Sequence, residues 1–301
     1  MLDTLTHQLF DHAGMFPPAA LSFEDAVTEA AELPEALKRP DLLQNDLVLT
    51  PEEWRKISDE SLAAAGFDRP LHVCLVGVDL DQAADVLREA QEWNTDGATA
   101  SPPRVVTAIE AHFSPGMALG TAVGRITALR YLSRGSIDLY IEPKWDDATW
   151  NKRMDDLMAM YDGLNADVEL HPVGLKFRAW GPTALRPETV AKLLPLVDER
   201  ALPLKATQGL HHPLCEGFEQ NTMGFLGLVA ALRFCDGGHL NDEERLALLT
   251  ESDASAFEFG DIITWRGHEL DVPAVDTARV PFSIGSCSLR EPDADLARLF
   301  D

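Results

Sequence analysis

The 301-residue chain has few basic residues, four cysteines and no long apolar run. Fifty acidic side chains stand against 25 basic ones, a formal net charge of −25, and such an acidic surface argues against binding of nucleic acid. No stretch approaches the roughly 18 apolar residues of a membrane span. The N-terminus, MLDTLTHQLF, lacks the basic flank and apolar core of a signal peptide. We therefore expect a cytoplasmic protein that contacts neither nucleic acid nor membrane.

The cysteines are widely separated and form no C-x-x-C pair: Cys74, Cys215, Cys235 and Cys287. This spacing is not that of a disulfide framework or of a structural zinc site. Cys74 lies inside an apolar run, where a thiol packs as a small apolar group. No G-x-G-x-x-G follows the early apolar runs, so a dinucleotide-binding Rossmann fold loses its main support.

Short apolar runs alternate with longer amphipathic segments along the chain. Seven runs predict strands, and a weaker candidate lies in 256–265: the seven are 46–50, 71–79, 104–113, 137–143, 173–180, 202–208 and 281–287. Most gaps hold a helix-like stretch, as where Thr50 precedes Pro51 and Glu53 in the pattern of a capping box. Strands too apolar for a half-exposed sheet, each followed by a helix, predict a parallel sheet covered by helices.

About eight such units in roughly 300 residues favour a (β/α)8 barrel of the TIM type over an open doubly wound sheet. We expect one domain over residues 1–301, with 1–45 as a helical and loop extension packed on the barrel. The segment 213–255 is longer than a standard unit and contains the apolar stretch GFLGLVAALRF. It is either a core helix, a cover over the barrel mouth, or a surface that packs on a second copy in a homo-oligomer.

Polar side chains share one face of four predicted strands. Because side chains alternate along a strand, each strand has two faces. The outer face of a barrel packs on helices, so the polar face must point inward, toward the C-terminal mouth where barrel enzymes place their sites. We expect the inward polar residues to form either an active site or a structural ion-pair network: Glu110, His112, Glu142, Lys176, Arg178, Lys205 and Thr207.

Two lysines on neighbouring strands are typical of Schiff-base chemistry. An amine attacks a carbonyl only when deprotonated, and a nearby cation or an apolar wall lowers the pKa of a lysine from about 10.4 toward neutrality. Lys176, Arg178 and Lys205 form such a cationic cluster. Glu110 or Glu142 would then transfer protons.

Histidines give a metal-dependent alternative. His211 and His212 belong to the loop above the mouth, where one could act as an acid or base near neutral pH. Together with His112 and Glu110 they could bind zinc or manganese, although adjacent residues rarely ligate one ion. We expect no cofactor, and keep a metal-dependent barrel hydrolase or lyase as the rival interpretation.

The succession GLKFRAWG, PETVAKLLPLV, PLKATQGL and SIGSCS is similar to deoxyribose-phosphate aldolases, a class I aldolase family. The resemblance implies that Lys176 forms an imine and that Lys205 lowers its pKa. Arg178 stands where the family has a threonine. The resemblance also implies that an anion is held by backbone amides around Gly285, Ser286, Cys287 and Ser288. A nucleophilic thiol is an alternative role for Cys287.

Over its length the chain is also similar to a family of bacterial proteins with three motifs, which imply no particular activity. They read D-H/Y-A-G-x-F-P-P-A, K-A-T-x-G-L-H-H-P and G-S-C-S-x-x-E-P, and stand here at 11–19, 205–213 and 285–292. His12, in the first motif, precedes the first predicted strand. Its loop either plugs the bottom of the barrel or reaches the mouth.

We therefore expect an enzyme that acts on a small anionic carbonyl metabolite, an aldolase-type lyase or an isomerase with lysine imine or enolate chemistry. Lys176, Lys205, Glu142, Glu110, His211 and His212 are the expected catalytic residues. Arg178, Thr207 and His112 are expected to contact the substrate. A third interpretation is a non-catalytic protein that holds a small anion with Lys176, Arg178 and Lys205.

Overall fold

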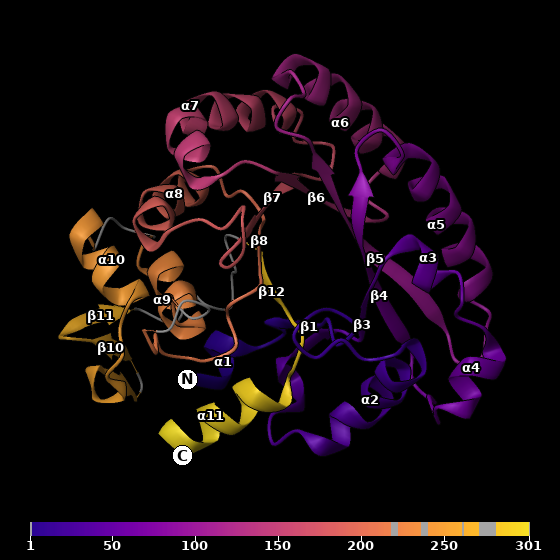
Figure 1. Cartoon of the computed structure of the whole chain (residues 1–301), viewed down its shortest axis with the longest axis horizontal. Helices are drawn as coiled ribbons and strands as arrows, with labels where there is room; N and C mark the ends of the chain where they lie inside the picture. The colour runs from indigo at the N-terminus through magenta and orange to yellow at the C-terminus, as the bar shows by residue number, and fades with distance from the viewer. Residues whose placement is uncertain (1, 218–221, 236–239, 261, 271–280, 301) are drawn as a thin grey trace.

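The structure is a computed structural model that describes residues 2–217, 222–235, 240–260, 262–270 and 281–300. Nine strands form one parallel sheet, in the order β2-β1-β12-β8-β7-β6-β5-β4-β3, which curls into a barrel with helices outside (Figure 1). β2 (Leu43–Asn45) and β3 (Leu47–Leu49) stand at the two ends of this order and are separated in sequence by Asp46 alone. Together they act as one strand that closes the barrel, so the predicted (β/α)8 fold is confirmed.

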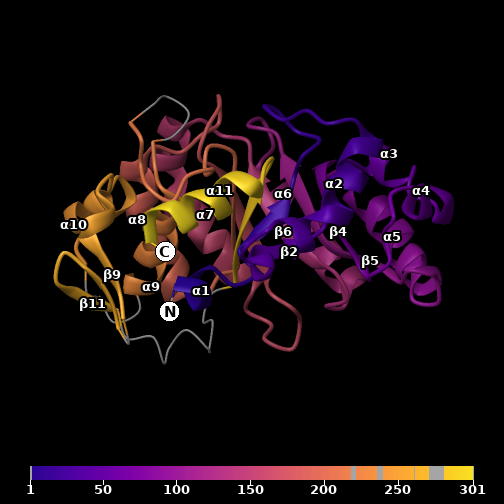
Figure 2. The same ribbon diagram turned by 90° about the horizontal axis from the view of Figure 1, so that it is seen from below.

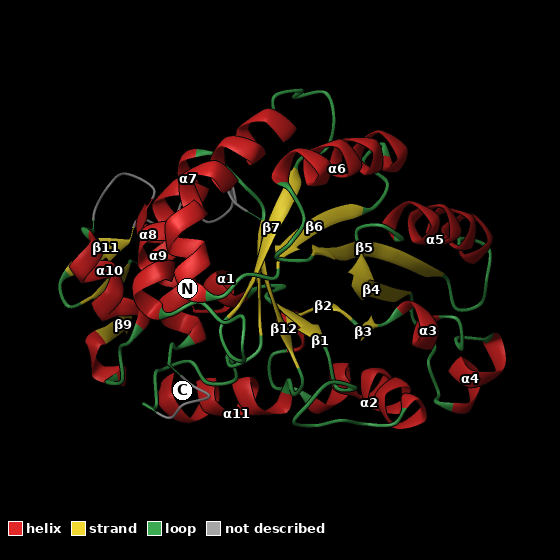
Figure 3. Cartoon of the chain, turned by 45° about the horizontal axis from the view of Figure 1, so that its top comes forward, coloured by secondary structure: helices red, strands yellow, loops and turns green. Residues whose placement is uncertain are grey.

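Seven predicted strands appear in the barrel, and those of 71–79 and 104–113 have the predicted bounds. Besides β2 and β3, the barrel strands are β1 (Phe10–His12), β4 (Leu71–Asp79), β5 (Arg104–Phe113), β6 (Asp138–Pro143), β7 (Val173–Arg178), β8 (Leu204–Thr207) and β12 (Phe282–Ser286). Helices surround the sheet in Figure 3: α2 (Phe23–Ala36), α3 (Pro51–Trp54), α4 (Asp59–Ala64), α5 (Ala83–Gly97), α6 (Leu119–Ser133), α7 (Asp147–Leu164), α8 (Pro187–Glu199) and α11 (Arg290–Phe300).

The weak strand candidate at 256–265 does not belong to the barrel. Its residues form β9 (Phe257–Phe259) and β10 (Ile263–Trp265), which pair with β11 (His268–Leu270) in a separate antiparallel sheet. Figure 2 shows this sheet at one end of the molecule, beside α10 (Asp242–Leu249). Strand-like periodicity alone does not indicate which sheet a strand joins.

The first strand of the barrel was missed. β1 pairs with β12 on one side and β2 on the other, yet its three residues carry no apolar alternation. The expectation that residues 1–45 are an extension packed on the barrel is therefore wrong for two segments, because β1 and β2 are strands of the sheet itself. Short helices complete this region: α1 (Leu2–Thr6) and the 3-10 helix η1 (Pro40–Leu42).

Within the segment 213–255, α9 (Phe225–Cys235) is a core helix. It packs against α8, α10 and α1, and the ring of Phe225 meets that of Phe10 edge to face, with centroids 5.1 Å apart. A side chain at Gly227 would collide with the backbone of Leu248, so glycine permits the close approach of α10. η2 (Ala254–Ala256) ends the segment. Of the three alternatives for this segment, the core helix is the one that α9 fits.

The buried apolar residues form two clusters, one on each face of the sheet. The larger lies between the sheet and the helices, and the smaller lies inside the barrel, formed by Ala13, Val48, Cys74, Val76, Ala108 and Tyr140. The smaller cluster takes its members from β3 to β6 and from the residue after β1, so it lies directly beside the charged groups of the interior. Within the described residues, no helix is long and apolar enough to cross a membrane.

Candidate functional site

The charged side chains point into the barrel as the alternation predicts. Leu175 and Phe177 of β7 belong to the outer core, whereas Lys176 and Arg178 face inward. In the pairing of β7 with β8, Lys176 stands beside Lys205 and Arg178 beside Thr207. The two lysines are therefore neighbours at one level of the barrel.

Glu110 lies between the two ammonium groups. Its Oε2 is 2.5 Å from Lys176 Nζ and its Oε1 is 2.8 Å from Lys205 Nζ. Lys205 Nζ also lies 2.5 Å from Asp11 Oδ2. All four side chains are buried, so these charges compensate one another where water cannot.

Glu142 holds the third cation. Arg178 donates to it through two nitrogens, Nε at 2.5 Å and Nη2 at 3.1 Å, and Lys176 Nζ lies 3.2 Å from its Oε2. Arg178 Nη1 donates to Gln208 Oε1 at 3.3 Å. The network thus joins three carboxylates to three cations, with Arg178 nearest the solvent.

The expected depression of the Lys176 pKa is wrong for this arrangement. Burial lowers that pKa, but the charges of Glu110 and Glu142 outweigh burial and leave it raised. The pKa of Lys205 is also raised, because Asp11 and Glu110 outweigh the effect of burial. Conversely, burial raises the pKa of Glu110, and the two lysines bring it down to about 2. Both lysines are ammonium ions at neutral pH.

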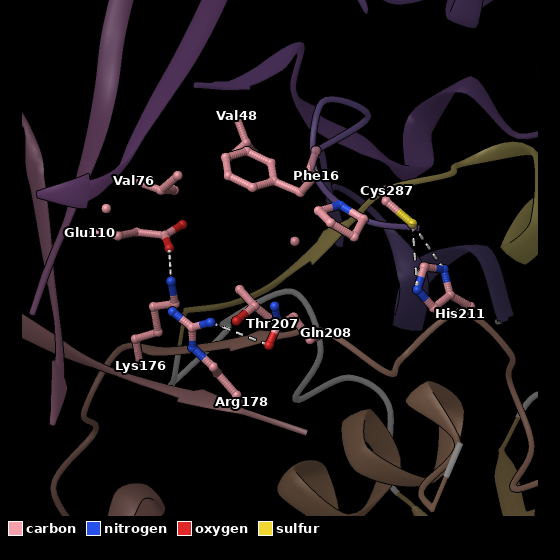
Figure 4. A pocket seen from close by; sticks show the side chains of 14 residues that line it. Phe16, Val48, Val76, Glu110, Lys176, Arg178, Thr207, Gln208, His211 and Cys287 are labelled. Carbon is pink, nitrogen blue, oxygen red and sulfur yellow. Dashed lines mark hydrogen bonds and ion pairs between the residues drawn. The ribbon is translucent and has the colours of Figure 1, made fainter. Parts of the chain in front are cut away.

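A cavity of about 140 Å³ opens above this network (Figure 4). Lys176, Glu110 and Arg178 lie on one side of it, with Thr207 and Gln208, while Lys205 does not reach it. Apolar side chains line a second part of the cavity: Ala13, Phe16, Pro17, Val48 and Val76. The apolar wall and the charged wall together suit a small, partly polar molecule.

His211 and Cys287 form the opposite wall. Cys287 Sγ lies 3.6 Å from His211 Nε2, and His211 Nδ1 lies 3.5 Å from Glu291 Oε2. Burial lowers the pKa of His211, so its ring is neutral near pH 7. Burial raises the pKa of Cys287, so its sulfur is a thiol. His211 is therefore ready as a base, while a nucleophilic thiolate at Cys287 is disfavoured.

The predicted metal ligands do not converge. His212 lines a different pocket, where its Nδ1 lies 2.6 Å from Asp295 Oδ2. His112 does not line the cavity, and its Nε2 lies 3.8 Å from Asp79 Oδ2. The set of Glu110 with these histidines is therefore not assembled.

Among the residues that the structure describes, one group of three offers metal-ligating atoms within reach of one another: Asp11, Cys74 and Glu110. Lys205 Nζ lies 2.5 Å from Asp11, 2.8 Å from Glu110 and 3.2 Å from Cys74 Sγ. An ammonium ion thus occupies the position that a metal would take.

The expected anion-binding segment covers the end of β12 and the residues after it, and two of its four residues line the cavity. Gly285 and Cys287 line the cavity. Ser286 and Ser288 do not, and Ser286 Oγ donates to the Ser288 carbonyl at 2.6 Å. The cradle was predicted for backbone amides, which these side-chain positions do not test, so it stays a prediction.

Several residues beneath the cavity were missed. Asn45 Nδ2 donates to Asp11 Oδ1 at 2.6 Å, and Thr107 Oγ1 donates to Asn45 Oδ1 at 2.5 Å. Cys74 Sγ lies 3.2 Å from Glu110 Oε1, so its surroundings are polar and not only apolar. Applying the alternation to 71–79 would have placed Cys74 inside, whereas Thr107 reaches inward from an irregularity in the pairing of β4 with β5.

The loop that follows His12 reaches the mouth, because Ala13, Phe16 and Pro17 line the cavity, whereas the His12 side chain does not. It points outward from β1, where Nδ1 lies 3.2 Å from the Asp46 carbonyl and Nε2 lies 3.4 Å from Glu29 Oε2. The neighbouring Asp11 is the residue of this motif that enters the charged network.

No protein-family model matches the chain, and no curated protein sequence matches it either. Among solved structures, the chain is similar to a deoxyribose phosphate aldolase from Aeropyrum pernix, described as tetrameric, with 15% identity and a TM-score of 0.45. The alignment covers 82% of this chain and 91% of that one.

Proposed function

We propose that this barrel is an enzyme that acts on a small anionic carbonyl compound, with Lys176 in contact with the carbonyl group. The observation that supports this most is position: among the described residues that line the cavity, Lys176 is the one lysine. Its ammonium group pairs with Glu110 and Glu142, and Arg178, which pairs with the same Glu142, supplies an anion-binding group beside it. Lys205, with its side chain 1% exposed, is a positioning residue that holds Glu110 from behind.

The proposed reaction is a lyase reaction through an imine. A Lys176 amine that has lost its proton to the solvent attacks the carbonyl carbon through Nζ, and the carbonyl oxygen leaves as water with one amine hydrogen and one proton from the solvent. The carbonyl and the ammonium thus become an iminium ion and water, with no net change in charge. His211 then removes the proton of the hydroxyl group on the β carbon, which is two positions from the iminium carbon. The carbon–carbon bond breaks, its electrons move into the iminium, and an enamine and an aldehyde result.

A second candidate is an isomerase that works through an enolate. The raised pKa of Lys176 supports it, because an ammonium ion at neutral pH can donate directly to a developing oxyanion. In that reaction His211 takes the proton from the α carbon, which bears a hydroxyl group, the hydroxyl proton passes to the former carbonyl oxygen, and His211 returns its proton to the former carbonyl carbon. No covalent bond to Lys176 forms.

Borohydride reduction tests the proposal. The full chain is incubated with small oxo acids, ketones and aldehydes and is then reduced with borohydride. The mass of the intact protein is measured by mass spectrometry. We expect an adduct that maps to Lys176, is lost in Lys176→Met, and persists in the exposed control variant Lys152→Met. No adduct on Lys176 rules out the imine reaction.

The enolate reaction predicts exchange of an α proton with deuterated solvent in the absence of any adduct. If neither adduct nor exchange occurs while a small anion still binds, the non-catalytic anion-binding protein is the better interpretation.

A further inference from the structure

The distance between Lys176 and Arg178 restricts the substrate. Glu142 Oε2 lies 3.2 Å from Lys176 Nζ and 3.1 Å from Arg178 Nη2, so those two nitrogens are no farther apart than the sum of these distances. Both side chains line the cavity, and Figure 4 shows them side by side. An anionic group that binds Arg178 while the carbonyl carbon contacts Lys176 must therefore lie very close to that carbon.

Arg178 retains hydrogen-bond donors for a ligand. A guanidinium group has five N–H bonds. Within the described residues Glu142 accepts from Nε and Nη2, and Gln208 accepts from Nη1, which leaves one N–H on each terminal nitrogen. Two donors on adjacent nitrogens match the two oxygens of a carboxylate.

We infer that the site binds the carboxylate of a 2-oxo acid on Arg178, an inference that rests on the proposed role of Lys176. In such a compound the carboxylate is bonded directly to the carbonyl carbon. Standard bond lengths then place a carboxylate oxygen about 3 Å from the lysine nitrogen. With a hydrogen bond of about 2.9 Å from that oxygen to Arg178, the carboxylate joins the two side chains within the upper bound that Glu142 sets. A phosphate group separated from the carbonyl by further carbons would extend beyond the guanidinium.

Charge also favours a carboxylate over a phosphate. The cations that line the cavity within the described chain are Lys176 and Arg178, and both already face carboxylates. His211 is neutral near pH 7, since burial lowers its pKa. No serine side chain adds a donor there, because neither Ser286 nor Ser288 is among the described residues that line the cavity. A single negative charge is thus easier to accommodate than two.

Titration calorimetry with oxamate tests this inference without imine chemistry. Oxamate has its carboxylate bonded to an amide carbonyl, which does not condense with lysine. We expect saturable binding that weakens roughly 10- to 100-fold in Arg178→Gln, as for loss of a charged hydrogen-bond pair. The control Arg88→Gln removes an exposed arginine that pairs only with Asp85 in the described chain, and should leave binding unchanged. Inorganic phosphate should compete weakly.

A second variant tests the inference even if Arg178→Gln does not fold. Gln208→Glu keeps the arginine but places a carboxylate beside Nη1, and should also weaken oxamate binding. Absence of saturable oxamate binding overturns the inference, as does equal affinity in Arg178→Gln and Arg88→Gln, or tighter binding of phosphate.

The two proposals can fail separately. Oxamate binding that depends on Arg178, with no carbonyl compound trapped on Lys176, would retain the carboxylate site and reject the imine. Trapping of neutral aldehydes on Lys176 without oxamate binding would retain the imine and reject the carboxylate site.

Discussion

Replacing Lys205 by methionine should destabilise the protein by about 3–5 kcal/mol, the usual cost of removing one partner of a buried ion pair. The Lys205 side chain is 1% exposed, and its Nζ lies 2.5 Å from Asp11 and 2.8 Å from Glu110. Glu110 keeps Lys176 as a partner in the variant. Asp11, fully buried, keeps only the Asn45 amide at 2.6 Å and the Ser283 hydroxyl at 3.5 Å among the described hydrogen-bond donors. Methionine fills a similar volume, so the cost is mainly electrostatic.

Lys176→Met should cost less, about 1–3 kcal/mol. Each of its carboxylates retains a cation in that variant, Glu110 the ammonium of Lys205 and Glu142 the guanidinium of Arg178. The double variant Lys205→Met with Asp11→Asn should recover about 0.5–3 kcal/mol relative to the sum of the single changes, because the isolated charge is gone.

Urea unfolding followed by tryptophan fluorescence measures these differences as midpoints at constant slope. The reasoning is refuted if Lys205→Met is no less stable than Lys176→Met, or if Asp11→Asn adds its full cost in the double variant. In that event Lys205 would not be the centre of a compensated buried network.

Three further outcomes follow from the same site. Because the pKa of Lys176 is raised above its ordinary 10.5, the rate of adduct formation should increase with pH and reach no plateau below that value. A plateau near pH 7, measured by borohydride trapping at fixed reaction times, would contradict this. The folded pKa of Glu110 is about 2 against an ordinary 4.5, so its ionised form stabilises the fold above pH 4.5, and this contribution is lost as the pH falls through about 2. The stability difference between wild type and Glu110→Gln, measured by urea unfolding, should shrink over that interval, and a constant difference would count against it. Iodoacetamide should label Cys287, which lines the cavity, before the fully buried Cys74; peptide mapping that shows the reverse order would argue against an open cavity.

Much of the barrel could be predicted from local patterns. Apolar runs followed by amphipathic segments indicate parallel strands covered by helices, and the strands of 71–79 and 104–113 have the predicted bounds. β1 escaped prediction because three residues are too few for a period of two to be recognised. Its place in the sheet depends on pairing with β12, which lies at the other end of the chain.

The same contrast holds within the site. Alternation along single strands indicates which side chains enter the barrel, since it depends only on the backbone geometry of neighbouring residues. That was enough to place Lys176, Lys205 and Glu110 together in one interior. The protonation of the two lysines was mispredicted, because Coulomb energies depend on separations of a few ångströms between residues far apart in sequence. Only the packed barrel sets Glu110 between two ammonium groups and brings Asp11 to Lys205, and those contacts raise the pKa values that a cluster of cations alone would lower.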